Sequence, residues 1–594
     1  MLAKLRKHLF LNSVNNCLTR LLSSWITTTF LLSFLSDNYL SLEACTATSV
    51  PVFVVLFAVV FFLYSTLLKS FELLQDEHLL LGSTLCYGIQ VLTLKGDAYY
   101  LFGVCAIFLI MFLYCYPKLK HDISSIQISN KHFAYVIIGL IILCTAFIGG
   151  LTIVRYLAYK GSTFDLGIFV QTFYNLKEHF TQDNTCERNM AISHLQVHTS
   201  FIYYLFTPIY LLFPKTETLL ILQAIAIASG LIPLSLICRK YKIPNFAIIL
   251  FAAAYIVTPG VLGGCFYDFH ENAFLLPLIL WMFYCYETNR SKLMFVFALA
   301  VCTVKEDAGI YVLVFALYLL FAKGKKEFKK SLPLLLLSIA YIAFAFYYLS
   351  KHGLGLMSYR FDNIMCGDSL LSIFKTALAN PGYLVTQMFS EDKWAFTLFI
   401  LLPLAGIPFF TKKYSNLILL IPFVFINLLP DYEYMHSIFF QYVFGPIAFL
   451  IYMSVVNLAA MKPQLRTQLL LISLAFSCFT FAGQIYPRKH YLADYKADSK
   501  VIQDINATLS LIPDDASVTA TTFFVPKLAN REEIYMLKME EVEQNIYYNT
   551  DYVAIDRRSA YLEEFDAAVS FYQSKGYETI VDASGSIMLL RKVQ

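Results

Sequence analysis

Residues 159–196 read YKGSTFDLGIFVQTFYNLKEHFTQDNTCERNMAISHLQ and form the first long polar interval in a strongly apolar chain. Asp165 stands there in an apolar frame that includes Phe164, Leu166 and Ile168, and His194 lies near the far end of the stretch. An ionisable residue beside a membrane is costly, so it marks a candidate functional site. We expect this stretch to be an extracytoplasmic loop that carries the chemistry of the protein.

The composition indicates a multi-pass membrane protein. Of the 594 residues, 58% are hydrophobic and 14% are charged, whereas roughly a quarter of the residues are charged in soluble proteins. The formal net charge of +4 comes without a basic stripe, so we expect membrane lipids as partners and no nucleic acid. The 13 cysteines are scattered without CxxC spacing, as is typical of small buried hydrophobic residues.

Apolar runs that approach the length needed to cross a membrane, about 20 residues, recur along the chain. They lie near residues 21–40, 51–69, 79–95, 98–117, 133–154, 218–237, 245–262, 273–286, 293–304, 308–322, 331–350, 395–411, 415–430, 438–456 and 467–484. We therefore predict an all-α polytopic membrane domain with about 15 membrane segments. It comprises extra N-terminal helices at 1–130 and a main module at 131–484, with a first outer loop at 156–217.

The positive-inside rule sets the expected orientation. The N-terminus, MLAKLRKHLF, is basic and is expected to be a retained cytoplasmic end in the plasma membrane. Residues 201–213 are short, tyrosine-rich and interrupted by Pro208, so we expect a helix lying along the surface. All later basic clusters then face the cytoplasm, provided that residues 293–322 form a bent hairpin with Lys305 to Asp307 at its outer tip. We expect the charges at this tip to be paired.

From about residue 485 the pattern becomes that of a soluble domain. Helices are expected at 498–511 and 560–575, and strands at 517–520, 533–537, 552–556, 578–582 and 586–593, the last two joined by a turn at 583–585. This predicts a small α/β domain at 485–594, on the extracytoplasmic side.

Two positions are the catalytic candidates. Asp165, partly desolvated by its apolar neighbours, could act as a general base, or it could cap the following helix together with Ser162 and Thr163. Asp268 lies in the dense polar cluster YDFHEN at 267–272. That cluster could orient a phosphate or an acceptor, could hold a divalent metal, or could be a polar turn outside the membrane.

The other candidates could bind substrate. Lys305 could neutralise a phosphate with an acidic neighbour holding it in place, although a self-paired hairpin tip would show the same residues. His194 and His198 are spaced as a ligand pair on one helix face, or they are hydrogen-bonded residues of the interface. The full set of substrate-binding candidates is His194, His198, His270, Glu271, Lys305, Glu306, Asp307, Arg360 and His436.

Several motifs carry a family resemblance. The segments are FDLGIF at 164–169, HLQVHTSFIYYLFTPIYLLFP at 194–214, YDFHEN at 267–272, KEDAG at 305–309, IPDDASVTA at 512–520 and DYVAID at 551–556. They resemble a large family of bacterial and archaeal multi-span proteins that is classed as a domain of unknown function and grouped with the GT-C glycosyltransferase superfamily. The loop holds one acidic residue where many relatives have an adjacent pair, which weakens the case for a metal.

The resemblance implies a GT-C-like fold and an inverting glycosyltransferase that uses a polyprenyl-phosphate sugar donor on the extracytoplasmic face. Asp165 matches the base of the first loop, and Asp268 falls where a second acidic residue is expected. A transporter or flippase of lipid-linked saccharides is the alternative function, since acidic residues also bind or relay protons in such proteins. A non-catalytic scaffold with a binding domain outside the membrane is a third.

Overall fold

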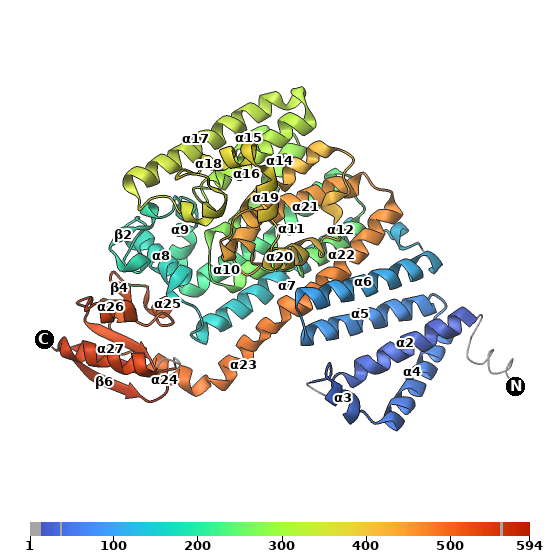
Figure 1. Cartoon of the computed structure of the whole chain (residues 1–594), viewed down its shortest axis with the longest axis horizontal. Helices are drawn as coiled ribbons and strands as arrows, with labels where there is room; N and C mark the ends of the chain where they lie inside the picture. Colours follow the sequence, from blue (N-terminus) through green and yellow to red (C-terminus); the bar gives the residue numbers. More distant parts are fainter. Residues whose placement is uncertain (1–13, 36–37, 121, 559–561, 594) are drawn as a thin grey trace.

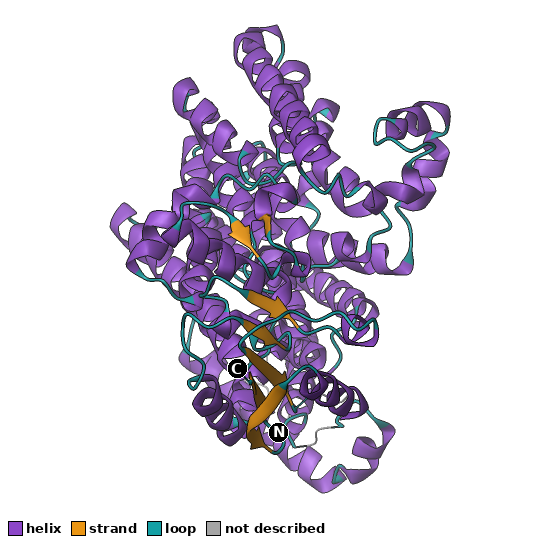
Figure 2. Ribbon diagram, turned by 90° about the vertical axis from the view of Figure 1, so that its left-hand side faces the viewer, coloured by secondary structure: helices purple, strands orange, loops and turns teal. Residues whose placement is uncertain are grey.

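The computed structural model describes residues 14–35, 38–120, 122–558 and 562–593. Apart from the short β1–β2 pair (Asp183–Asn184 and Ile192–Ser193), its strands gather near the C-terminus and the rest is mostly helical (Figure 2). The fold class that the sequence predicts, a helical membrane part with a small α/β part, is confirmed. The basic N-terminal residues 1–10 lie outside the described residues, so their cytoplasmic position stays a prediction.

The N-terminal helices form a group at the opposite end of the molecule from the C-terminal sheet (Figure 1). They are α2 (Val14–Leu32), α3 (Leu42–Ala47), α4 (Val50–Ser70), α5 (Asp76–Leu94) and α6 (Ala98–Cys115). Helices α5 and α6 pack against α22 (Pro463–Gln484). At this junction the backbones of Gly96 and Gly483 touch, which leaves no room for a Cβ at Gly96.

A buried ion pair ties α2 to α5. The Arg20 guanidinium meets the Asp76 carboxylate with two bonds, Nε to Oδ1 at 2.9 Å and Nη2 to Oδ2 at 3.2 Å. Arg20 also donates to the Ser65 hydroxyl of α4 at 3.0 Å. Since Arg20 is 0% exposed, this charge is compatible with an apolar setting only because it is paired.

The main module surrounds helix α21 (Phe444–Ala459), whose side chains are almost all buried. Its other long or apolar helices are α7 (Asn130–Leu157), α10 (Thr216–Ser229), α11 (Leu231–Lys240), α12 (Asn245–Tyr255), α13 (Pro259–Leu262), α14 (Leu275–Glu287), α15 (Ser291–Cys302), α16 (Gly309–Tyr318), α17 (Phe328–His352) and α20 (Glu391–Leu401). Two short helices, α18 (Ser372–Ala379) and α19 (Pro381–Gln387), lie in the long connection between α17 and α20.

In the described residues every predicted apolar segment overlaps helical structure, but the helices differ in length. Within the described residues, 7 helices are long and apolar enough to cross a membrane, or 8 when α12 and the bent continuation from Pro259 are counted as one span. Others are shorter, such as α14 and α15, or are 3-10 and π turns, as at Tyr414–Leu420 and Phe423–Leu428. The number of complete crossings therefore stays a prediction.

The predicted hairpin and the predicted short helix are both present. Helices α15 and α16 are separate, and the turn between them carries Lys305 and Glu306. The two charges are paired, but with Glu271 and His198 from other segments rather than with each other. The apolar run at 201–213 forms α9 (Tyr203–Leu212), which at 10 residues is too short to span a bilayer.

The C-terminal part forms a five-stranded sheet in the order β4-β3-β5-β7-β6. Its strands are β3 (Val518–Ala520), β4 (Ile534–Met536), β5 (Tyr552–Asp556), β6 (Tyr577–Ala583) and β7 (Ile587–Lys592), and its helices are α23 (His490–Ala497), α24 (Ser499–Leu509), α25 (Val525–Leu528), α26 (Met539–Glu543) and α27 (Leu562–Ser574). Strand β3 pairs in parallel with β4 and β5, whereas β7 pairs antiparallel with β5 and β6. The predicted elements are thus present, including the hairpin turn, where Gly585 has φ +78°.

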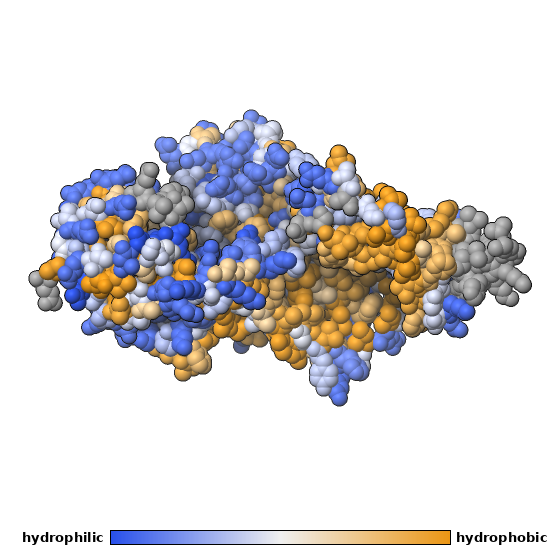
Figure 3. Space-filling model, turned by 90° about the horizontal axis from the view of Figure 1, so that it is seen from below, coloured by the Kyte–Doolittle hydropathy of each residue, from blue (hydrophilic) through white to orange (hydrophobic). Residues whose placement is uncertain are grey.

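The polarity of the surface differs between the two ends of the molecule. Seen from below, the end that holds the C-terminal sheet is largely hydrophilic, while the side of the N-terminal helices is largely hydrophobic (Figure 3). On α4, for example, Val50, Val55 and Phe62 are more than half exposed. Exposed apolar side chains on this scale are those of a lipid-facing surface.

The ion pair between α2 and α5 gives a stability prediction. Asp76→Asn leaves the buried Arg20 charge without its counter-ion, and we expect destabilisation of roughly 3–5 kcal/mol. Thermal melting in detergent, run beside the exposed Asp566→Asn control, measures the effect. Equal melting temperatures for the two variants would contradict it.

Candidate functional site

The turn that carries Asp165 is strained. Helix α7 ends at Leu157, and the short element η3 (Thr163–Gly167) leads into α8 (Ile168–Glu178). Within η3 the Asp165 backbone has φ 65° and ψ −75°, a γ-turn geometry that non-glycine residues rarely adopt. Strain of this kind collects at functional sites and persists only where the surrounding structure holds it.

The structure decides between the two interpretations of Asp165. A capping side chain accepts a hydrogen bond from the first turn of its helix, but no side-chain cap is formed at the start of η3 or α8. Ser162 and Thr163 instead donate to Asp268 and to the Thr522 carbonyl. Asp165 is therefore not a helix cap.

The Asp165 carboxylate is half-buried and, within the described residues, has no hydrogen bond or ion pair. Burial raises its pKa to about 8, and the negative charges of Glu271 and Asp268 add to this effect more than Lys305 opposes it. A carboxyl group with this proton affinity suits general base catalysis near neutral pH.

Asp268 lies beside the same turn but is fully engaged. Its Oδ1 is 2.5 Å from Nη1 of Arg155, at the end of α7. Its Oδ2 accepts from the Ser162 amide at 3.4 Å and from the Ser162 hydroxyl at 3.3 Å. Burial raises the pKa of Asp268 to about 6 despite the Arg155 cation. The two predicted acidic positions thus converge, with Asp268 bracing the segment that leads to Asp165.

Glu271 is at the centre of a buried polar network. It accepts from the Tyr203 hydroxyl at 2.6 Å and lies 3.4 Å from the Lys305 ammonium. His270 Nδ1 accepts the Asn272 amide at 3.2 Å, and burial holds the pKa of His270 well below its usual value, so this ring is neutral.

The charges of Glu271 and Lys305 depend on each other. Burial opposes ionisation of Glu271, but its neighbours, His270 and Lys305 first among them, hold its pKa well below the usual range. Lys305, whose ammonium is 3.4 Å from the Glu271 carboxylate, is the cation paired with it. Burial likewise opposes the charge on Lys305, and Glu271 and Glu306 more than offset it, so the pKa of Lys305 is raised.

Two histidine–glutamate pairs flank this network. His194 Nδ1 lies 2.9 Å from Glu187 Oε2, and His198 Nδ1 lies 2.9 Å from Glu306 Oε1. The two rings are 5.5 Å apart, yet each nitrogen faces a different carboxylate. Burial and Lys305 lower the pKa of His198. Burial also opposes the charge on His194, but the charge and the hydrogen bond of Glu187, with the charge of Glu271, together outweigh it and raise the pKa of His194. The histidines are hydrogen-bonded residues rather than a ligand pair.

Arg360 approaches the network from the α17–α20 connection. Its guanidinium lies over the rings of Tyr432 and Tyr442, at 5.3 and 5.5 Å. Its Nε is buried without a hydrogen-bond partner, and in the described part of the chain it forms no ion pair. Tyr442 lies near both Arg360 and the site. The charged groups that act on the Tyr442 hydroxyl are Arg360, Lys305, Asp165 and Asp307.

The remaining two candidates behave differently. Asp307 is half-buried and has no side-chain partner among the described residues, and burial together with Glu306 raises its pKa to about 6. His436 lies outside the cluster, where the charges that act on it are those of Lys393, Asp392, Asp431 and Glu433. Asp307 is therefore the second free carboxylate beside Asp165.

The donor set does not fit a divalent metal. No group of three or more His, Cys, Asp or Glu residues in the described ranges could hold one. The oxygens of Asp268 are taken by Arg155 and Ser162, and Glu306 is paired with His198. Cations and N–H groups already satisfy the carboxylates that the sequence suggested as ligands, so no step is assigned to a metal.

Sequence reasoning missed four residues of this network: Arg155, Glu187, Tyr203 and Tyr442. Arg155 carried a usable signal, because a basic residue at the outer end of an apolar segment runs against the positive-inside rule. The tyrosines gave none, since their partners are distant in the sequence. Glu187 lies only seven residues before its partner His194, but the pair matches no motif.

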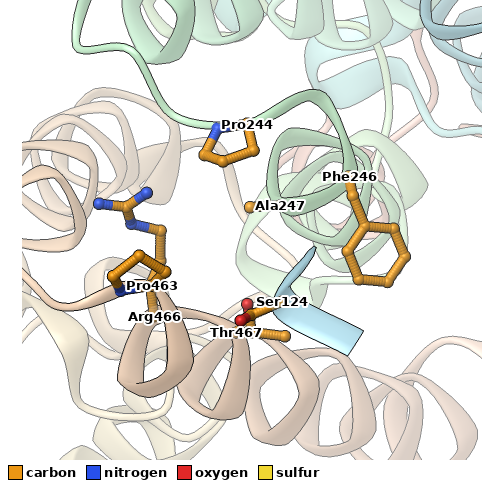
Figure 4. A pocket seen from close by; sticks show the side chains of 7 residues that line it. All are labelled: Ser124, Pro244, Phe246, Ala247, Pro463, Arg466 and Thr467. Atoms are coloured by element: carbon orange, nitrogen blue, oxygen red, sulfur yellow. The ribbon is translucent and has the colours of Figure 1, made fainter. Parts of the chain in front are cut away.

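The residues named above as the network line neither of two further cavities. One encloses about 10 Å³ between α12, α22 and Ser124, roughly the room of one water molecule. Arg466 is among the residues that line it (Figure 4), and it donates to the carbonyls of Leu458, Ala459 and Met461 at the end of α21. A cation at a helix C-terminus stabilises the helix, so this feature is structural. The other, of about 530 Å³, is open and is lined by Ser358, Asp362, Met365, Gly367 and Asp368.

Comparisons with known proteins gave the following matches. The family described as Predicted membrane protein (DUF2079) matches residues 155–588. No curated protein matches the chain. ArnT from Cupriavidus metallidurans bound to undecaprenyl phosphate is 8% identical with a TM-score of 0.47, covering 78% of this chain and 99% of its own. The arabinofuranosyltransferase AftD from Mycobacteria is 12% identical with a TM-score of 0.42, covering 79% of this chain and 40% of its own.

The charges around Asp165 give a pH prediction. A hydrophobic carbodiimide reacts with the protonated carboxyl group, so the pH of half-maximal labelling at Asp165, read by mass spectrometry, reports its pKa. Glu271→Gln removes a negative charge and should lower this pH from about 8, whereas Lys305→Met removes a positive charge and should raise it. Shifts in the same direction would contradict the assignment, since general loosening of the site acts alike in both variants.

Proposed function

This chain belongs to the DUF2079 family of predicted membrane proteins, and from that premise we propose that it is an integral-membrane glycosyltransferase. It takes a sugar from a polyprenyl-phosphate carrier on the extracytoplasmic face and passes it to an acceptor hydroxyl with inversion. One observation carries the proposal. Among the described residues the Asp165 carboxylate has no hydrogen-bond partner, and its pKa is raised. It lies in the same group of charged side chains as two cations, Lys305 and Arg360.

Asp165 is the base in this reaction. It takes the proton from the acceptor hydroxyl as the hydroxyl oxygen attacks the anomeric carbon. The bond from that carbon to the phosphate oxygen breaks, and its electron pair leaves with the lipid phosphate. Attack from the side opposite the phosphate inverts the anomeric centre. With a pKa of about 8, the Asp165 carboxylate is a stronger base than an ordinary aspartate. A pKa close to the working pH is what a general base needs.

The two cations have separate tasks. Lys305 is paired with Glu271, and the charge of Glu306 also favours its charged form, so it supplies a positive potential at a set position. Arg360 is held by aromatic rings and has unused N–H capacity, which suits it to bind phosphate oxygens as they gain charge. Undecaprenyl phosphate, the lipid bound in the compared ArnT structure, is the first carrier to test.

The membrane setting completes the proposal. The protein is a multi-pass membrane protein with several long apolar helices, and we place it in the plasma membrane with its N-terminus in the cytoplasm. The Asp165 turn and the C-terminal sheet lie outside. The charges that act on Asp165 come from Glu271, Lys305, Asp268 and Glu187, and this gathering of ionisable residues near one turn supports a transferase over the transporter alternative.

The base assignment is tested by transfer of labelled sugar from polyprenyl-phosphate donors. Asp165→Asn should lower transfer by roughly 10²- to 10⁴-fold while donor binding is retained. Asp183→Asn, the same change at an exposed position of the same loop, should leave transfer unchanged.

Asp307→Asn is the discriminating variant of that experiment. Asp307 is the other carboxylate without a side-chain partner, so a loss of transfer confined to Asp307→Asn would move the base to that residue. Full activity of Asp165→Asn would remove Asp165 from the mechanism.

The phosphate assignment is tested on the donor. Arg360→Met should weaken donor binding by roughly 10- to 100-fold, as expected for loss of hydrogen bonds to a charged group. Arg591→Met, an exposed arginine of β7, is the matched control. Unchanged donor affinity in Arg360→Met would place the phosphate elsewhere.

A further inference from the structure

We propose that the C-terminal α/β domain positions the Asp165 turn, and that Thr522 and Val525 are its positioning residues. The inference rests on the proposed function only in naming Asp165 as the base. The contacts that carry it join segments about 360 residues apart in the chain, so they are made by the folded C-terminal domain and not by the loop itself.

Thr522 holds the first residue of the turn from two directions. The Thr163 amide donates to the Thr522 hydroxyl at 3.0 Å. The Thr163 hydroxyl donates to the Thr522 carbonyl at 3.3 Å. This reciprocal pair fixes both the backbone and the side chain two residues before Asp165.

Val525 holds the last residue of the turn by close packing. A Cβ on Gly167 would lie 2.9 Å from Cγ1 of Val525, which is closer than van der Waals contact allows. Gly167 has φ −64° and ψ −45°, so its backbone does not require glycine. The restriction comes from Val525, a fully buried and β-branched side chain with little freedom to rotate.

The segment just before the turn is held by the same domain. Arg558 donates to the carbonyls of Ala158 and Tyr159, each at 3.1 Å, at the end of α7. It is oriented by Asp556, with Nη2 2.7 Å from Oδ2. The Tyr159 hydroxyl donates to Asn506 Oδ1 at 2.7 Å. The chain is thus fixed on both sides of Asp165.

The contacts with the Asp165 turn are made at the carboxyl ends of two strands of the sheet. Thr522 follows β3 and Arg558 follows β5, and the two strands are parallel neighbours. Open sheets with parallel strands bind ligands at the carboxyl ends of those strands. Here the Asp165 turn occupies that place. The domain therefore binds part of its own chain where related sheet architectures bind a ligand.

Holding the turn in this way accounts for its strain. Without the domain we expect the Asp165 backbone to relax out of φ 65°, because a strained backbone persists only where the surrounding structure holds it. When the turn relaxes, the carboxylate moves toward water, and the burial that favours its protonated form is lost.

The test uses the full-length protein, four variants at the contact and one control variant. Thr522→Val removes the hydroxyl that accepts from Thr163, and Thr522→Ser restores it. Gly167→Ala introduces the clash with Val525, and Gly167→Ala combined with Val525→Ala relieves it. Thr579→Val, at an exposed position of β6, is the control for a threonine change elsewhere in the sheet.

The readout is the pH dependence of carbodiimide labelling at Asp165, which requires no transfer activity. We expect half-maximal labelling to move to lower pH by one unit or more in Thr522→Val and Gly167→Ala. It should return to the wild-type value in Thr522→Ser and in the double variant, and Thr579→Val should leave it unchanged.

Each outcome decides a separate point. A wild-type labelling curve in both Thr522→Val and Gly167→Ala, each shown to be folded by its melting temperature, would overturn the positioning role. Should Gly167→Ala fail to fold, Thr522→Val against Thr522→Ser decides alone. Labelling shifts without sugar transfer by the wild-type protein would retain the positioning role and reject the proposed function.

Discussion

The site depends on one constrained turn. Asp165 has φ 65° and ψ −75° and is held between the end of α7 and the C-terminal sheet. Arg155 and Asp268 secure the approach to it, Thr522 its first residue and Val525 its last. Such strain persists only when the surroundings over-determine the backbone. The packing of the C-terminal sheet and its helices on the helical part of the chain is therefore part of the site itself.

The electrostatics follow from how the acidic residues are paired. A buried charge is tolerated when it is paired and hydrogen-bonded, and this holds for Glu187, Asp268, Glu271 and Glu306. Asp165 shares their surroundings without sharing a cation. Because no cation balances its charge, the Asp165 carboxyl group favours its protonated form. Its pKa is therefore raised, and it can act as a base where the paired carboxylates cannot.

The sequence predicts the outline of this arrangement but not its connections. Hydropathy and charge placed the helices, the hairpin tip at Lys305 and the strands near the C-terminus, because each is a local pattern. The pairing of Lys305 with Glu271, of His198 with Glu306 and of Thr163 with Thr522 was beyond reach, since the partners lie 34, 108 and 359 residues apart. His436 was a candidate from its place in a polar segment predicted to lie outside the membrane, and the charges that act on it are those of Lys393, Asp392, Asp431 and Glu433.

The measurement that tests the account most directly is an experimental structure of the protein with a non-transferable polyprenyl-phosphate sugar analogue. We expect the phosphate to lie between Lys305 and Arg360 and the anomeric carbon to face the Asp165 carboxylate. The bond from that carbon to the phosphate should point away from Asp165. A sugar bound far from Asp165, or a lipid phosphate held at another face of the helices, would contradict it.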